Sequence, residues 1–276
     1  MRKAMLGVVC GVALLAGCQS VDTTQSSAVG VDRHQRMMIS SEEVNKGSAQ
    51  AYHEVLAQAQ KQGALDKDAA AVARVKAIVG RLIPVTGALR PDAPGWQWET
   101  HVLSSKEVNA WCMAGGKIAV YTGLIDQIKP TDEELAAVIG HEMGHALREH
   151  VREQASRQMG EQLAVGIAGA VLGLPDIAQQ LAPMVLDLTF NLPHSRQQET
   201  EADRIGVELA ARAGYDPHAA ISLWEKMAKI GGSQPPKWLS THPSNEDRAK
   251  DLRAISEQVM PLYQAAKSGG NASAGK

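Results

Sequence analysis

The alternation of apolar and polar residues divides the chain into helical parts and one strand-rich part. From residue 40 to residue 82 apolar residues recur at helical spacing, with a helix start at Ser41 and Glu42. The stretch WQWETHV then alternates in the manner of a strand, and NAWCMAGGKIAVYTGLID reads as two short strands joined through Gly115 and Gly116. We therefore expect a small antiparallel sheet within residues 96–124.

The second half of the chain returns to a helical pattern. Thr131 and Glu134 fit a capping box, which predicts a long helix from there to about Met159. Two more helices are expected at about 197–213 and 218–230, on either side of GYDP. The pattern predicts a mostly helical α+β fold, with a single domain over residues 41–262.

One apolar stretch between these helices needs its own interpretation. LAVGIAGAVLGL, residues 163–174, is about 12 residues long and therefore too short to span a membrane. We interpret it as a buried or substrate-covering helical segment.

Both ends of the chain differ from this domain. Arg2 and Lys3 precede a short apolar run, which is typical of a signal peptide, here residues 1–17. The sequence LAGC resembles the bacterial lipobox and implies cleavage before Cys18 and lipid attachment to it. Residues 18–40, rich in Ser, Thr and Gln, are expected to be a flexible tether. The low-complexity residues 263–276 are expected to be a disordered tail.

Composition narrows the class of protein. The chain has 276 residues, 44% of them hydrophobic and 21% charged, which is typical of a soluble globular protein. Its net charge of −2 argues against a nucleic-acid partner. If Cys10 leaves with the signal peptide and Cys18 carries lipid, Cys112 is left alone and cannot form an intramolecular disulfide.

The predicted helix at 131–159 contains the sequence His-Glu-x-x-His. His141 and His145, four residues apart, lie on one face of a helix and can bind one zinc ion. Glu142 lies next to that face, where it can take a proton from a metal-bound water without being a ligand. A catalytic zinc site normally needs a third protein ligand.

The third ligand is not supplied by the same helix. A metzincin would have Gly at position 148 and His at position 151, whereas this chain has Arg148 and Val151. His150 projects about 140° away from His145 on a helix, and we interpret it as a solvated residue.

The later helix offers two glutamates. The apolar face of RQQETEADRIGVELAARAG slightly favours an inward Glu199, and leaves Glu201 to be read as an exposed helix charge. Asp203 falls on the same side as Glu199 and could accept a hydrogen bond from a ligand histidine.

These motifs carry a resemblance. HEMGHALREH followed by ETEADRIG resembles the gluzincin family of zinc metallopeptidases of the HtpX, BepA, LoiP and Oma1 type, over most of residues 75–255. The resemblance implies a zincin-type fold with an edge strand beside one zinc ion, and it makes Glu199 the third ligand. The absence of repeats beyond residue 263 resembles the short LoiP-like bacterial lipoproteins.

Two further stretches take roles from this resemblance. NAWCMAGGKIAVYTGLI resembles the family's strand pair, which implies that the strand carrying Asn109, Trp111 and Met113 binds the substrate backbone. Core packing of Trp111 and Met113 is the equal alternative. In STHPSNEDR the resemblance brings His242 close to zinc, with Arg248 as its companion. His242 could then stabilise the reacting oxygen or replace the water, and the alternative is a loop histidine capping a helix; His194 is expected to be a spectator.

The function implied is zinc-dependent cleavage of misfolded or misassembled envelope proteins in the periplasm. Partners would be these unfolded proteins, the membrane through the lipid, and the outer-membrane assembly machinery; Gln19 after Cys18 favours the outer membrane. The alternative is a chaperone-like lipoprotein that binds unfolded chains and has a structural zinc. Glu142 argues against it, since a structural zinc needs no base.

Overall fold

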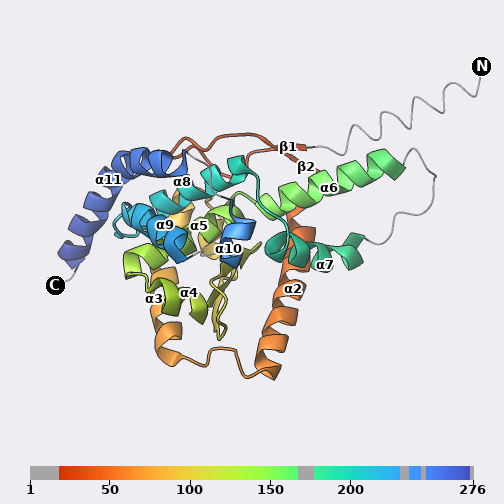
Figure 1. Cartoon of the computed structure of the whole chain (residues 1–276). Coiled ribbons are helices and arrows are strands. Elements are labelled where there is room, and N and C mark those ends of the chain that lie inside the picture. The colour runs from red at the N-terminus through yellow and green to blue at the C-terminus, as the bar shows by residue number, and fades with distance from the viewer. Residues whose placement is uncertain (1–18, 167–176, 231–235, 244–246, 274–276) are drawn as a thin grey trace, which may run out of the picture.

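The structure, a computed structural model, describes residues 19–166, 177–230, 236–243 and 247–273 (Figure 1). Its helices are α2 (Ser41–Lys61), α3 (Ala69–Val85), α4 (Thr122–Ile128), α5 (Asp132–Leu147), α6 (His150–Gly166), α7 (Ile177–Phe190), α8 (Arg196–Arg212), α9 (Ala219–Ile230), α10 (Lys237–Thr241) and α11 (Arg248–Ser273). Two 3-10 turns, η1 (Thr86–Ala88) and η2 (Ala93–Gly95), follow α3. The mostly helical α+β class is confirmed.

The larger sheet is mixed, which corrects the expected antiparallel one. It contains β3 (Glu99–Leu103), β4 (Ala110–Met113) and β5 (Lys117–Tyr121), in the order β3-β5-β4. β4 and β5 are antiparallel and joined at Gly115 and Gly116, whose φ angles are +78° and +83°. The tight turn sends β5 into the place between β4 and β3, so β3 pairs with β5 in parallel, Glu99 opposite Lys117. The alternation in sequence reveals strands, but not which of them is central.

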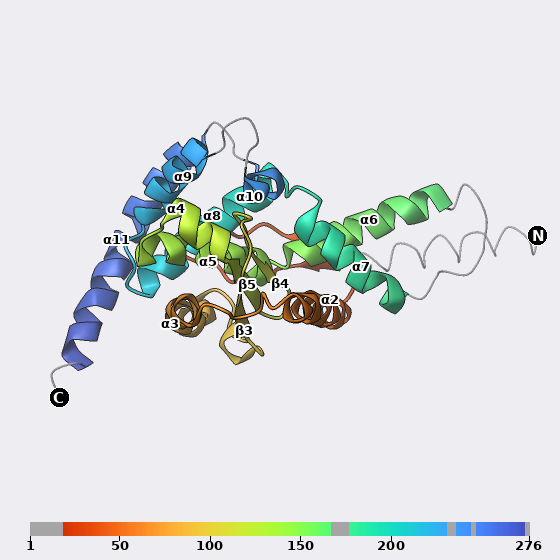
Figure 2. The same ribbon diagram turned by 60° about the horizontal axis from the view of Figure 1, so that its bottom comes forward.

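The elements that carry the site lie next to this sheet. α5 packs on β4 along one side and on α8 along the other. α3 contacts β3, and α2 and α7 contact β4, so the sheet lies between α3 and α2 in Figure 2. No helix in the described ranges is both long enough and apolar enough to cross a membrane.

Helix starts follow the capping chemistry expected from sequence. Thr131 accepts from the backbone of Glu134 while the Glu134 side chain accepts from the backbone of Thr131, a complete capping box at the start of α5. A second box joins Ser195 and Gln198 at the start of α8. Both helices that supply the histidine and glutamate motifs therefore begin at a defined residue.

The N-terminal residues 19–40 are folded, so the expectation of a flexible tether is wrong for them. β1 (Gln19–Val21) pairs with β2 (Gln35–Met37) in an antiparallel ladder. Val29, Val31 and Ile39 are buried, 2–4% exposed. Thr23, Thr24 and Gln35 are also buried, and hydrogen bonds inside the protein satisfy them, which composition does not reveal.

The predicted helix 131–159 is broken near its middle. α5 ends at Leu147 and α6 begins at His150, because Glu149 has a left-handed backbone with φ +50°. The side chain of Arg148 points into the protein and is 0% exposed. The break changes the direction of every residue after 148, and a continuous helix cannot predict where His150 points.

The C-terminal tail is also corrected, because α11 continues to Ser273. Leu252 and Val259 bury the first part of this helix against the domain. Once a packed segment has formed the first turns, each added residue extends a helix at little cost, even in a low-complexity sequence. Residues 1–18, which include Cys18, and residues 167–176, which include most of the apolar stretch 163–174, lie outside the described residues.

Glycines let α5 and α8 approach closely. A Cβ on Gly206 would lie 2.6 Å from the backbone nitrogen of His141, and one on Gly140 would lie 2.9 Å from the carbonyl oxygen of Gly206. Both contacts are with backbone atoms, which cannot move aside as a flexible side chain can. Only glycine fits at this crossing.

We expect Gly206→Ala to lower the free energy of unfolding by about 1–3 kcal/mol, since the methyl group must push the helices apart. Gly80→Ala is the matched control, because Gly80 lies on α3 with no atom within 4 Å of its would-be Cβ. That change should be neutral or stabilising by up to about 1 kcal/mol. Denaturant unfolding of both variants checks this; equal stability of the two would contradict the proposed contact.

Candidate metal centre

α5 and α8 bring three potential metal ligands together. Nε2 of His145 lies 3.1 Å from Nε2 of His141 and 3.4 Å from Oε1 of Glu199. Nε2 of His141 lies 3.7 Å from Oε2 of Glu199. All three side chains are 1–5% exposed. The structure thus places Glu199, rather than Glu201, with the two histidines.

A fourth nitrogen completes the group. His242 follows α10, and one potential ligand atom from each of these four residues lies within 4.8 Å of the others. Nδ1 of His242 is 3.0 Å from the carbonyl oxygen of Trp238, which can only accept, so Nδ1 carries the hydrogen. Its Nε2 has a free lone pair and, among the described residues, no hydrogen-bond partner, so it is suited to bind a metal rather than to donate a hydrogen bond.

The unpaired atoms of this group fit a cation. Nδ1 of His141 lies 2.9 Å from a carboxylate of Asp203 and so carries its hydrogen. The facing Nε2 atom therefore has a lone pair directed toward His145. Oε1 of Glu199 is likewise buried without a partner. Several lone pairs converging in a buried space repel one another unless a positive ion lies among them, and nitrogen with carboxylate oxygen is a donor set that zinc prefers.

Asp203 and Arg248 hold the ligands in place. Arg248 donates through Nη2 to Asp203 at 2.6 Å and through Nη1 to Glu199 at 3.1 Å, and its guanidinium lies 3.3 Å over the ring of Trp224. Burial works to raise the pKa of Asp203, but the charge of Arg248 and the hydrogen bond with His141 outweigh it and keep that pKa below its usual value. Asp203 therefore remains a carboxylate that can orient His141.

Glu142 faces the same space without joining the ligand cluster. The indole Nε1 of Trp238 donates to its Oε1 at 2.6 Å, and Nε2 of His242 is 3.5 Å from the same oxygen. Burial raises the pKa of Glu142 to about 8. A cation beside it lowers that pKa again, which gives a carboxylate able to take and return a proton near neutral pH.

The structure corrects the interpretation of three other residues. His150, expected in solvent, is 0% exposed, and Glu201, expected to be an exposed charge, is 6% exposed; the two lie 3.2 Å apart. His194, expected to be a spectator, stacks on His145 with ring centroids 4.0 Å apart and accepts from Gln154. The break after Leu147 causes the first error, because it turns His150 back toward the ligands.

The strand residues expected to contact substrate have buried side chains. Trp111 and Met113 are 3% and 0% exposed and belong to the hydrophobic cluster with Tyr52, the position that the core-packing alternative expects for these two side chains. The Asn109 side chain is 5% exposed, accepts from the backbone of Ala110 and does not line the metal centre.

The outer edge of β4 nevertheless remains available for pairing. Tyr121 of β5 donates to the backbone carbonyl of Asn109, so alternate residues of β4 pair with β5. Ala110 and Cys112 then direct their backbone groups to the outer edge. Trp238 donates to the backbone carbonyl of Val108 at 3.3 Å, so α10 covers the start of this edge.

Sequence reasoning missed Trp238. It is 1% exposed, contacts Glu142, and stacks on His242 at 4.7 Å. A tryptophan near HPSN was the available signal, but its contact with a residue 96 positions earlier depends on the fold.

When the chain is compared with known protein families, the model of peptidase family M48 matches residues 69–256. The chain belongs to this family. Members of this family are zinc metallopeptidases, which hydrolyse peptide bonds.

Three relatives indicate how far the similarity extends. Metalloprotease LoiP of Escherichia coli K12 is 30% identical over 91% of this chain and 95% of its own length. Metalloprotease YcaL of the same strain is 26% identical over 91% and 96%. Mitochondrial metalloendopeptidase OMA1 of Arabidopsis thaliana is 38% identical over 63% of this chain but 35% of its own length. The chain spans about a third to a half of the length of the OMA1 relatives it matches, and thus covers only part of those proteins.

The direction of the His242 hydrogen gives a prediction. If Nε2 occupies a coordination position, His242→Ala should lower zinc affinity and raise the turnover of an unfolded substrate at saturating zinc. Zinc titration and a fluorescent casein assay measure the two quantities, with His218→Ala, 39% exposed on its side chain, as control. Lower turnover with zinc retained would instead mean that Nε2 donates to the reacting oxygen.

Proposed function

We propose that the chain cleaves misfolded or misassembled proteins of the bacterial envelope, as a zinc-dependent endopeptidase held by lipid at the periplasmic face of the outer membrane. The observation that carries the chemistry is the convergence of His141, His145 and Glu199, with Glu142 beside them. The lipobox-like LAGC and the similarity to LoiP along nearly the whole of both chains support the location in the envelope.

In this proposal His141, His145 and Glu199 hold zinc. When bound, zinc lowers the pKa of water and polarises the substrate carbonyl. Glu142 accepts the proton of the attacking water and passes it to the leaving amine. Asp203 orients His141, and Arg248 holds both Asp203 and Glu199, so the ligands do not rearrange as charge develops.

The geometry also favours unfolded substrates. A peptide that pairs with Ala110 and Cys112 must be extended, and folded proteins rarely offer a free extended segment. Glu142 and the four potential ligands are only 1–4% exposed, and Trp238 of α10 lies on Glu142, so a peptide enters only after α10 moves. An enzyme of this kind acts on chains that are already open, which suits removal of misassembled proteins and contact with the outer-membrane assembly machinery.

One observation favours a second function. With His242 the centre has four protein ligands, the number typical of structural zinc sites. A chaperone-like lipoprotein that binds unfolded chains without cutting them would have such a centre. The buried Glu142, which that function does not need, is the reason we prefer the peptidase.

Glu142→Gln separates the two functions. The glutamine oxygen still accepts from Trp238 but cannot take a proton, so zinc should stay bound while cleavage falls by about 100-fold or more. Degradation of an unfolded outer-membrane protein, followed by gel, gives the rate.

Glu208→Gln is the matched control, because Glu208 is equally buried on α8 but pairs with Arg212. The control should cleave at the wild-type rate. Zinc-bound Glu142→Gln that cleaves as fast as wild type excludes this base. Zinc-bound wild type that cuts no unfolded substrate favours the binding function.

The membrane anchor has its own test. Cys18→Ala should move the protein from the membrane fraction to the soluble periplasmic fraction of a Gram-negative host, since no lipid can attach. Cys112→Ala, at the buried cysteine, is the control and should stay with the membrane. Fractionation and mass spectrometry of residue 18 give the result; an unmodified Cys18 in wild type would refute the anchor.

A further inference from the structure

The ligand His145 makes an unusual contact on the side away from the metal centre. Its Nδ1 lies 2.8 Å from Nδ1 of His150, and the Nε2 of His150 lies 3.2 Å from Oε2 of Glu201. Metal-binding histidines usually donate their second nitrogen to a carboxylate, a backbone carbonyl or water. His141 follows this rule with Asp203, whereas His145 reaches a carboxylate through a second histidine.

The contacts fix where each hydrogen lies. With zinc bound to Nε2 beside Glu199 and His141, as in the proposed function, the hydrogen of His145 is on Nδ1 and is donated to His150. Nδ1 of His150 must then accept, which places its own hydrogen on Nε2. That nitrogen donates to Glu201, which is acceptor-only as a carboxylate. Each nitrogen in the series has one possible role.

Glu201 is itself held by two arginines. Arg33 donates through Nε to its Oε1 at 2.6 Å, and Arg148 donates through Nε to its Oε2 at 3.0 Å. Each carboxylate oxygen of Glu201 thus accepts from a guanidinium group, which favours its charged form. Glu201 is therefore the fixed, charged end of the series.

The N-terminal segment forms the outer part of this arrangement. Arg148 donates from Nη1 to the hydroxyls of Thr23 and Thr24, both at 3.1 Å, and from Nη2 to the carbonyl of Arg33 at 2.9 Å. Gln35 donates to the carbonyl of Arg148 at 2.8 Å. Residues 23–35 thus supply one of the two arginines that hold Glu201, Arg33, and bind the other, Arg148.

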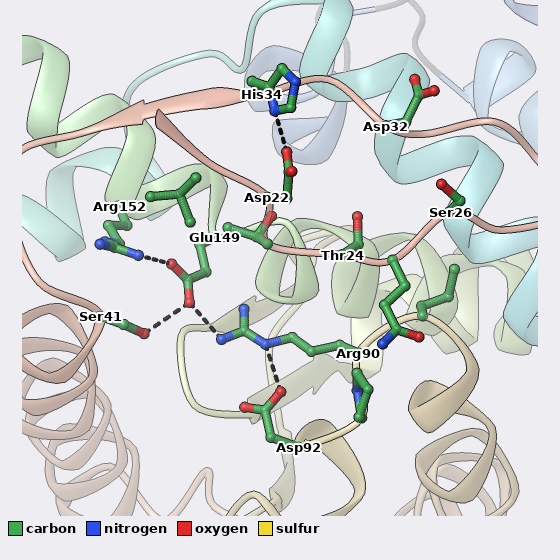
Figure 3. A pocket seen from close by; sticks show the side chains of 15 residues that line it. Asp22, Thr24, Ser26, Asp32, His34, Ser41, Arg90, Asp92, Glu149 and Arg152 are labelled. Atoms are coloured by element: carbon green, nitrogen blue, oxygen red, sulfur yellow. Dashed lines mark hydrogen bonds and ion pairs between the residues drawn. The ribbon is translucent and has the colours of Figure 1, made fainter. Parts of the chain in front are cut away.

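The turn that directs His150 inward is held from the opposite side. Glu149 lies in a pocket of about 810 Å³ between the N-terminal segment and residues 89–92, which join η1 to η2. Figure 3 shows it bonded to Arg90, Arg152 and Ser41. Glu149 is the residue with the left-handed backbone, so three partners keep α5 and α6 at the angle that brings His150 to His145.

We propose that His150 is a positioning residue that fixes the tautomer and ring orientation of His145, and that residues 23–35 hold it through Glu201 and Arg148. The N-terminal segment is then part of the structure that holds the metal centre, and not merely a tether. The inference rests on the zinc centre of the proposed function and goes beyond its substrates.

Charge explains why a histidine stands between His145 and the carboxylate. Glu142, Glu199 and Asp203 already place three acidic groups at the centre. A carboxylate directly on His145 would add a fourth close by, whereas His150 moves Glu201 outward to two arginines that balance it. Like charges brought together in a buried site raise one another's pKa, and the intervening histidine avoids this cost.

The test measures zinc binding rather than turnover. His150→Ala should raise the zinc dissociation constant by about 10- to 100-fold, by competition with a chromophoric chelator, and change the visible absorption of the cobalt(II) form. His150→Gln should recover most of the affinity, since its amide oxygen can accept from His145 and its amide nitrogen can donate to Glu201. If His150 had a role in folding alone, His150→Ala would keep the wild-type cobalt spectrum, and His150→Gln would have no lost zinc affinity to recover.

Arg33→Ala tests the N-terminal segment, with Arg204→Ala as matched control. Arg33 is 28% exposed on its side chain, so its loss should be tolerated, and we expect a smaller but measurable loss of zinc affinity. Arg204 binds Asp251 through two hydrogen bonds from the same helix as Glu201 and should leave affinity at the wild-type value.

Wild-type affinity and an unchanged cobalt spectrum in His150→Ala would overturn the proposal. If His150→Ala does not fold, Arg33→Ala decides it, and equal affinity in Arg33→Ala and Arg204→Ala would then overturn it. Neither result bears on the peptidase function, which the Glu142→Gln variant tests. A wild-type protein that binds no zinc would instead refute that function.

Discussion

The close contact of α5 and α8 at Gly140 and Gly206 is the constraint on which the metal centre depends. The two helices are distant in sequence, and each carries only part of the ligand set. Backbone-to-backbone contact at the glycines brings Glu199 within 3.4–3.7 Å of the histidine nitrogens. A wider crossing would separate these atoms, because side chains of fixed length would have to span a longer distance. The capping boxes at Thr131 and Ser195 then set where along each helix the motifs fall.

Burying so much charge requires compensation, and the structure supplies it in two directions. On the α8 side Arg248 neutralises Asp203 and Glu199. On the α6 side Arg33 and Arg148 balance Glu201 and Glu153. An unpaired charge in such a place costs several kcal/mol, so each arginine stabilises the fold as well as orienting a ligand. Stability and the shape of the site are therefore set by the same side chains.

The short helix α10 covers the metal centre. α10 places Trp238 on Glu142 and His242 beside the ligands, and its backbone takes the first free position on the edge of β4. The fold thus holds the chemical groups ready while covering them. In the proposed function, a covered centre limits unwanted cleavage of other proteins.

Local patterns in the sequence predict most of the helices and the His-Glu-x-x-His motif, and the resemblance adds the choice of Glu199. The patterns follow local rules: spacing of 3.6 residues, capping chemistry and a ligand pair on one helical face. The parallel pairing of β3 with β5, the folded state of residues 19–40 and the inward position of His150 emerge only from the folded chain. Each depends on contacts between residues far apart in the chain: Arg33 meets Glu201, and Thr23 meets Arg148. Polar residues of this kind look like solvated surface in a sequence, because the partner that makes burial favourable is supplied by another element.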